Sequence, residues 1–141
     1  MGLDMYAYVA ARAGQQTEFY EGAEWDADLK EHRNPNVNKP REIAYWRKHP
    51  NLHGWMAQLW LGRENNELRD AGNFNGIELE LTAEDLDNLE RAVKKRRLPA
   101  TSGFFFGTDA DQHYYKDDLK FIQLARAEMF LGLKVFYNSS W

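Results

Sequence analysis

Apolar and polar side chains alternate in three short stretches of the chain, one near its start, one near residue 80 and one near its end. Successive side chains of a strand point to opposite faces, so each stretch predicts a strand with one apolar face. The alternating apolar residues are Leu3, Met5, Ala7 and Val9, then Ile77, Leu79 and Leu81, then Leu133, Val135 and Tyr137. We therefore expect strands over residues 3–10, 76–81 and 133–138.

The stretch from Arg41 to Trp60 carries the densest mixture of aromatic, cationic and apolar side chains. Pro50 divides it, because proline lacks an amide hydrogen and disfavours helical backbone in the residue before it. We expect one helical piece from Ile43 and a second piece after Pro50. In the second piece the apolar residues share one helical face, where Trp55 and Leu59 are expected to be buried. The members of that face are Leu52, Trp55, Met56 and Leu59.

Two longer helices are expected in the second half of the chain. One begins after Thr82, whose hydroxyl is placed to cap it, and its apolar stripe is followed by the basic run Lys94–Arg97. The other runs from about Tyr114 to Phe130 and ends at Gly132, a residue suited to the left-handed backbone of a helix end. Acidic residues near its start, Asp117 and Asp118 among them, are expected to cap it.

Residues 14–40 form the least regular part of the chain, rich in Glu, Asp and Asn. A connection of this length is uncommon unless it is functional or carries short elements of its own. We expect Phe19, Tyr20 and Trp25 to hold it against the domain. The aromatic triplet Phe104–Phe106 is expected to plug the core.

The order of these elements favours one architecture. Helix-bearing connections are not regularly repeated, which argues against a doubly wound parallel sheet. We predict a single α+β domain over residues 1–141, with a small, mainly antiparallel sheet of three or four strands and about three helices packed on one face.

Composition narrows the classes of function. Hydrophobic residues make up 43% of the chain and aromatic residues 14%, so a real core is expected. The net charge of −4 argues against a general polyanion-binding surface, so a nucleic acid partner is not expected. No apolar run reaches the length of a membrane span, and no secretory signal or cysteine is present. We expect a soluble cytoplasmic protein that does not bind a membrane.

Several strings of residues carry a resemblance. The chain starts Met-Gly-Leu-Asp-Met-Tyr, has Tyr-Trp-Arg-Lys at residues 45–48, and carries Ser-Gly-Phe-Phe-Phe-Gly at residues 102–107 before a terminal Ser-Ser-Trp. Together they resemble a family of small uncharacterised proteins of bacteriophage and prophage genomes. The resemblance touches both ends and the middle of the chain. It implies a bacterial or phage cytoplasmic setting and carries over no catalytic residue.

One group of residues is the candidate ligand site. Arg47 and Lys48 supply positive charge, Tyr45 a hydroxyl, and His53 a group that titrates near neutral pH. With Ser102, on a glycine-containing turn, they are expected to point into one concavity that would suit a phosphate. The alternative is a solvated surface whose long cationic side chains cover apolar neighbours.

Other candidate chemistry has a structural interpretation that we favour. His49 and His53 have the spacing of two metal ligands, but Pro50 lies between them, so no metal site is predicted. No nucleophile elbow surrounds Ser102 or the terminal serines, and no sequence motif calls for a cofactor. Two classes of function stay open. One is a non-catalytic protein that binds a protein or small-molecule partner, and the other is an enzyme or sensor for a small phosphate-containing ligand.

Overall fold

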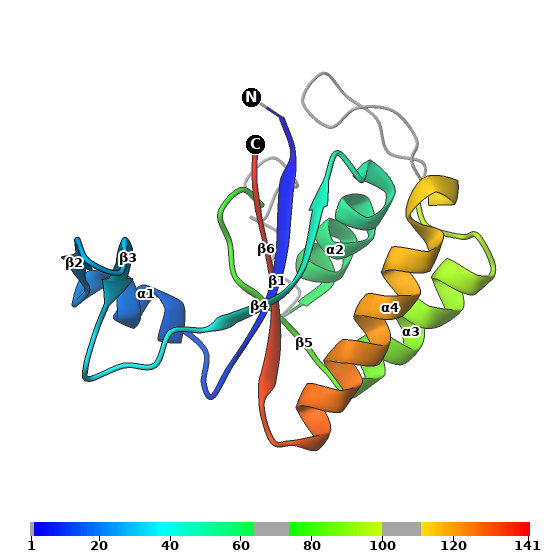
Figure 1. Ribbon diagram of the computed structural model, residues 1–141. Coiled ribbons are helices and arrows are strands. Elements are labelled where there is room, and N and C mark those ends of the chain that lie inside the picture. Colours follow the sequence, from blue (N-terminus) through cyan, green and yellow to red (C-terminus); the bar gives the residue numbers. More distant parts are fainter. Residues whose placement is uncertain (1, 64–73, 100–110) are drawn as a thin grey trace.

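The computed structural model of the protein describes residues 2–63, 74–99 and 111–141. Their elements are β1 (Asp4–Ala10), α1 (Gln15–Glu21), β2 (Glu24–Asp26), β3 (Glu31–Arg33), β4 (Arg41–Arg47), α2 (Pro50–Gly62), β5 (Leu79–Leu81), α3 (Ala83–Lys94), α4 (Asp111–Phe130) and β6 (Lys134–Ser140). Figure 1 shows the main sheet nearly edge-on, with α2, α3 and α4 on one side and α1, β2 and β3 projecting on the other. We call residues 11–40 the arm, and the sheet face turned away from α2–α4 the outer face.

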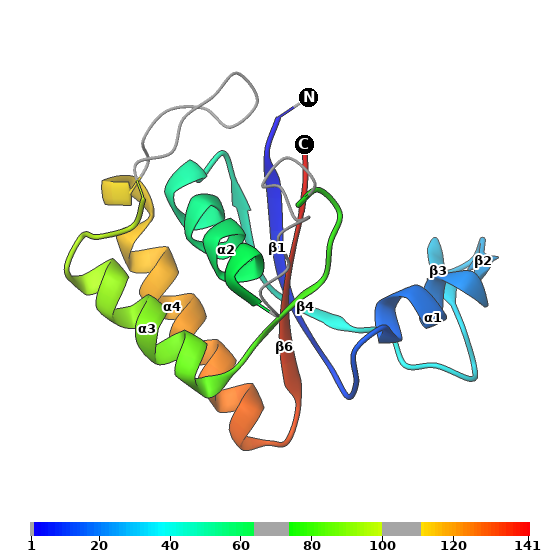
Figure 2. The ribbon, with the colours of Figure 1, turned by 180° about the vertical axis from the view of Figure 1, so that it is seen from behind.

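Four strands form one sheet in the order β4-β1-β6-β5, and each neighbouring pair is antiparallel. The central strands β1 and β6 pair without a break from Asp4 opposite Ser140 to Ala10 opposite Lys134. The predicted α+β class, with a small antiparallel sheet and helices on one face, is confirmed (Figure 2). None of the described helices has the length and hydropathy that a membrane span requires.

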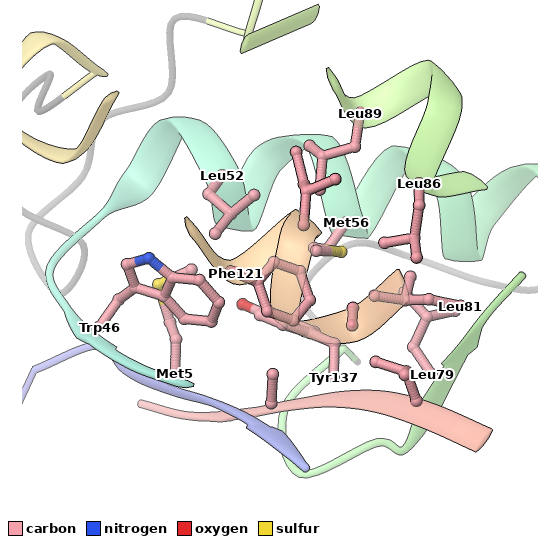
Figure 3. Packing of buried hydrophobic residues seen from close by; sticks show 14 of the residues in the cluster. Met5, Trp46, Leu52, Met56, Leu79, Leu81, Leu86, Leu89, Phe121 and Tyr137 are labelled. Atoms are coloured by element: carbon pink, nitrogen blue, oxygen red, sulfur yellow. The ribbon is translucent and has the colours of Figure 1, made fainter. Parts of the chain in front are cut away.

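The core fills the space between the sheet and the helices, as Figure 3 shows. Alternation decides which strand residues enter it: Met5 and Ala7 of β1 are fully buried, whereas Tyr6 between them is 37% exposed. Across the layer, buried side chains come from all three helices. They include Leu52 and Met56 of α2, Leu86 and Leu89 of α3, and Phe121 and Ile122 of α4.

The prediction that a helical piece begins at Ile43 is wrong, because Arg41–Arg47 is the edge strand β4. Trp46 is buried while Tyr45 and Arg47 are exposed, which is the period of a strand. After the strand the backbone turns at Lys48, whose φ is 55°, and α2 begins at Pro50. Pairing with β1 holds this segment in a strand, and the local sequence pattern does not indicate that pairing.

Two predictions about burial need correction in degree. Leu52 and Met56 are fully buried, but Trp55 and Leu59 are only half-buried, so the core-facing stripe of α2 is turned toward Leu52 and Met56. In the β5 region Leu79 and Leu81 are buried as expected. Ile77 is 36% exposed, since the strand begins only at Leu79.

Helix α3 starts as predicted. The Thr82 hydroxyl accepts a hydrogen bond from the Asp85 amide at 3.2 Å, and the Asp85 carboxylate accepts one from the Thr82 amide at 2.8 Å. Both bonds satisfy amides that have no partner inside the helix.

Replacing Thr82 with Ala should lower the free energy of unfolding by about 1 kcal/mol, because the Asp85 amide loses its acceptor. Chemical denaturation would measure the change. Thr82→Ser is the matched control, since it keeps the hydroxyl and should retain most of the stability. Equal losses in the two variants would show that the methyl group, rather than the cap, matters.

Helix α4 runs from Asp111 to Phe130 and is followed by Gly132 with φ of 89°, which confirms the predicted helix end. The expected capping by Asp117 and Asp118 is wrong, because both lie inside the helix. Asp118 is fully buried instead. The triplet Phe104–Phe106 lies outside the described residues.

The arm carries short elements of its own, as a connection of that length suggested. Phe19 of α1 is buried, but Tyr20 is 46% and Trp25 is 59% exposed. Of the three aromatic residues expected to hold the arm against the domain, only Phe19 is therefore buried. The β2–β3 hairpin has exposed or half-buried side chains at every position.

Candidate functional site

Tyr45 and Arg47 lie on the outer face of the sheet. The Tyr45 hydroxyl donates to Asp4 Oδ1 at 2.7 Å, and Arg47 Nε lies 4.0 Å from the same oxygen. The hydrogen bond to the Asp4 carboxylate raises the pKa of Tyr45. The rings of Tyr45 and Tyr6 have centroids 5.2 Å apart, so the two form an exposed aromatic pair across β4 and β1.

The backbone of Lys48 joins the end of β4 to the segment before β1, since its amide donates to the carbonyl of Leu3 at 2.8 Å. Its side chain is exposed. The carbonyl of Arg47 accepts a hydrogen bond from the Tyr114 hydroxyl at 2.5 Å, which fixes the strand end to α4. Arg47 and Lys48 thus present positive charge near the edge of the outer face.

His53 lies on the other side of the sheet, in the core. It is 2% exposed, and its Nδ1 lies 2.8 Å from the Tyr137 hydroxyl oxygen. The rings of Phe74 and Trp141 pack against it. Burial lowers the pKa of His53 to about 4, so the ring is neutral near pH 7.

The prediction that Tyr45, Arg47 and His53 converge in one concavity is therefore wrong. Tyr45 and Arg47 lie on an exposed face of β4. His53, a residue of α2, is buried and contacts Tyr137 of β6. Ser102, the fifth proposed member, lies outside the described residues. Arg47, Lys48 and Tyr45 stay together, but His53, the group expected to titrate near neutral pH, is not among them.

His49 and His53 each have a partner of their own. His49 Nε2 lies 2.8 Å from Asp118 Oδ2, and both side chains are fully buried. The His49 ring also stacks on Tyr114 at 4.5 Å. Within the part of the chain that the structure describes, no group of three His, Asp or Glu side chains is placed to hold a metal.

Sequence reasoning missed the His49–Asp118 pair, although one signal pointed to it. Asp118 follows Tyr114 by four residues and precedes Phe121 by three, so it falls on the core-facing side of α4. A carboxylate at such a position needs a polar partner in the core. Its pairing with His49 joins α4 to the start of α2.

The outer face is hollowed between β1 and α1. Two open hollows, of about 510 and 590 Å³, share Tyr8, Gln16 and Tyr20 in their walls. The first extends over Tyr6 toward the start of β4, and the second extends toward residues 76–78. We call the second the Glu78 hollow. Its lining consists of Tyr8, Gln16, Thr17, Tyr20, Glu21, Gly76, Ile77, Glu78 and Asn138.

Glu78 connects the sheet to the arm at this place. Its Oε2 accepts a hydrogen bond from the Tyr8 hydroxyl at 2.5 Å, and its Oε1 accepts one from the Gly14 amide at 3.0 Å. Burial and the nearby Glu78 carboxylate raise the pKa of Tyr8, which stays protonated. Below the hydroxyl, the Tyr8 ring stacks on Phe136 with centroids 5.6 Å apart.

A third hollow, of about 780 Å³, lies within the arm beneath Trp25. The ring of His32 meets Trp25 and Tyr20 edge to face at 5.1 and 5.8 Å. These ring contacts join the β2–β3 hairpin to α1. They add aromatic surface on the arm.

The outer face and the core carry different kinds of side chain. Aromatic rings, amides and carboxylates line the outer face, and the buried histidines His49 and His53 lie behind the sheet. Comparisons of the chain with protein-family models, with curated proteins and with solved structures find no significant match.

Proposed function

We propose that the protein is a non-catalytic binding protein that holds a partner protein on the outer face of its sheet and on the arm. The observation that carries this proposal is the exposed aromatic surface opposite the helices. Tyr6 and Tyr45 lie on the sheet, and Tyr20 and Trp25 lie on the arm, with 37% to 59% of each residue exposed.

The free energy of burying exposed aromatic rings supports a binding role for this surface. Exposed rings gain free energy when a partner removes them from water, at roughly 25 cal/mol for each Å² of apolar surface. Tyrosine, tryptophan and arginine are enriched among the residues that dominate protein interfaces. Tyr45 and Arg47 both approach the Asp4 carboxylate on the sheet, so a tyrosine and an arginine lie side by side there.

The arm supports it independently. A two-stranded hairpin is at best marginally stable by itself in water, and β2 and β3 are only three residues long each. A partner that covers Trp25 and the hairpin would stabilise it. The resemblance of several sequence strings to phage and prophage proteins implies a bacterial or phage cytoplasm as the setting of this role.

A phosphate-binding enzyme or sensor built on Arg47 and His53 has less support. These side chains lie on different sides of the sheet, and His53 is held in the core. A ligand that meets Arg47 cannot also exchange a proton with His53. We therefore prefer the binding role.

Peptide arrays or random-peptide selection would test the proposal. Peptides selected on the wild-type protein should lose affinity by at least about 30-fold for the Tyr6→Ala/Tyr45→Ala double variant, the loss expected of interface hot spots. Fluorescence polarisation with labelled peptides would measure the affinity. Circular dichroism would confirm that the variant is folded.

Phe130→Ala/Leu131→Ala is the matched control. These residues are 91% and 73% exposed at the end of α4, away from the outer face, and their loss should leave affinity unchanged. Selected peptides that respond to the control rather than to the tyrosine variant would overturn the proposed surface. Turnover of any substrate in a broad hydrolase or transferase screen, abolished by Arg47→Ala, would overturn the non-catalytic role.

A further inference from the structure

The Glu78 carboxylate is held in place at the floor of the Glu78 hollow. Tyr8 and Gly14 donate to its two oxygens from different segments of the chain, so both its position and its orientation are fixed. A carboxylate has about four acceptor sites, and these two bonds occupy two of them. The carboxylate therefore retains capacity for two further donors.

The Glu78 carboxylate has no ion-pair partner among the described residues. Both donors to Glu78 are neutral groups, and no ion pair to Glu78 is formed within the described ranges 2–63, 74–99 and 111–141. Glu21 of α1 lines the same hollow and likewise makes no ion pair within those ranges. Among the described residues that line the hollow none is cationic, and two carboxylates, those of Glu78 and Glu21, lie in this lining.

The remaining walls suit a flat cation. The ring of Tyr20, which is 46% exposed, stands on the α1 side, whereas Tyr8 on the sheet side is 4% exposed and already stacks on Phe136. Aromatic faces attract ammonium and guanidinium groups, and guanidinium stacks on them more readily. The amides of Gln16 and Asn138 add acceptors.

We propose that the Glu78 hollow binds an arginine side chain of the partner, an inference that rests on the proposed function. The guanidinium would donate two hydrogen bonds to the free acceptor sites of Glu78. Its plane would lie against the Tyr20 ring, and Glu21 would add a second negative charge at the rim. Lysine would bind less tightly, because a single ammonium cannot form the paired, planar contact.

Glu78 also holds the arm to the sheet, so its test must separate binding from folding. Glu78→Gln keeps the shape of the side chain. Its amide oxygen can accept from Gly14, and its amide nitrogen can donate to the Tyr8 hydroxyl. Glu21→Gln offers a second variant, since Glu21 is exposed and makes no side-chain hydrogen bond within the described residues.

The experiment is a titration of the full chain with the peptide Ac-Gly-Arg-Gly-amide. Changes in the amide chemical shifts of the protein in NMR spectra measure the binding. Shifts should concentrate at Gly14, Gln16, Tyr20, Gly76 and Asn138. The citrulline analogue, which has the same shape without the charge, should bind at least about tenfold more weakly. Glu78→Gln and Glu21→Gln should each weaken the arginine peptide several-fold, with Glu84→Gln on the exposed start of α3 as the unaffected control.

Equal binding of the citrulline and arginine peptides would overturn the inference, as would shifts confined to other parts of the chain. Unchanged affinity in both the Glu78→Gln and Glu21→Gln variants would do the same. The two proposals fail separately. Loss of the arginine site with retained dependence on Tyr6 and Tyr45 in the peptide selections leaves the binding role intact. If instead the arginine peptide binds as expected but the selected peptides do not depend on Tyr6 and Tyr45, the arginine site stands and the proposed partner surface does not.

Discussion

Replacing Trp46 with Ala should lower the free energy of unfolding by about 3–5 kcal/mol, a large part of the stability of a domain of this size. Trp46 is 2% exposed and meets the ring of Phe121 edge to face at 5.1 Å. Figure 3 shows it packed between β1 and α4 beside Met5. Removing the indole leaves a cavity that the neighbouring strands and helices cannot close.

Denaturant unfolding followed by circular dichroism would measure this loss. Trp25→Ala is the matched control, because the same side chain is removed from a position that is 59% exposed. Its effect on the unfolding free energy should stay within about 0.5 kcal/mol. A loss below about 1 kcal/mol for Trp46→Ala would show that β4 is not packed on α4 as described.

Stability should also fall in acid because of His53. Burial among aromatic rings, with the Tyr137 hydroxyl as the hydrogen-bond partner, lowers the pKa of His53 from 6.5 to about 4. Between these values the unfolded chain binds a proton at His53 that the folded protein does not bind, so unfolding takes up a proton. The contribution of His53 to the free energy of unfolding is therefore complete above pH 6.5 and is lost as the pH falls from 6.5 to about 4. At about 1.4 kcal/mol for each pH unit in this window, the loss amounts to about 3 kcal/mol.

The contribution of His53 is the difference between two pH profiles. Unfolding free energies of the wild type and of His53→Asn would be measured from pH 7.5 to pH 4, a range set by those two pKa values. The variant lacks the titrating ring, so its profile should be flatter. His32→Asn, at an exposed position on the arm, should keep the wild-type slope. Parallel profiles for wild type and His53→Asn would contradict the burial of a neutral imidazole at this position.

Local patterns predicted the elements whose causes are local. The alternation of Leu3, Met5, Ala7 and Val9 specifies a strand with one apolar face, and pairing with β6 leaves that alternation unchanged. Thr82 caps α3 through atoms three residues away, and Gly132 ends α4 through its own backbone freedom. These features need no knowledge of the rest of the chain.

The candidate site depends on contacts that are remote in sequence. Glu78 meets Tyr8 across 70 positions and Gly14 across 64, and no periodicity indicates such contacts. Arg47 and His53 are only six positions apart, and their charge and titratable ring predict one shared anion site. The structure separates them, since β4 lies in the sheet and α2 packs on its covered face.

The sequence by itself therefore determined the α+β class, the central strands and the helices α3 and α4, through side-chain periodicity and local capping. Only the tertiary structure decided that Arg41–Arg47 is an edge strand, because β1 supplies the hydrogen-bonding partner. It also decided which polar residues are buried, as with His49, His53 and Asp118, and which aromatic residues are exposed, as with Tyr45 and Trp25. Burial depends on which surfaces meet after the layers have packed, and residues far apart in the chain supply those surfaces.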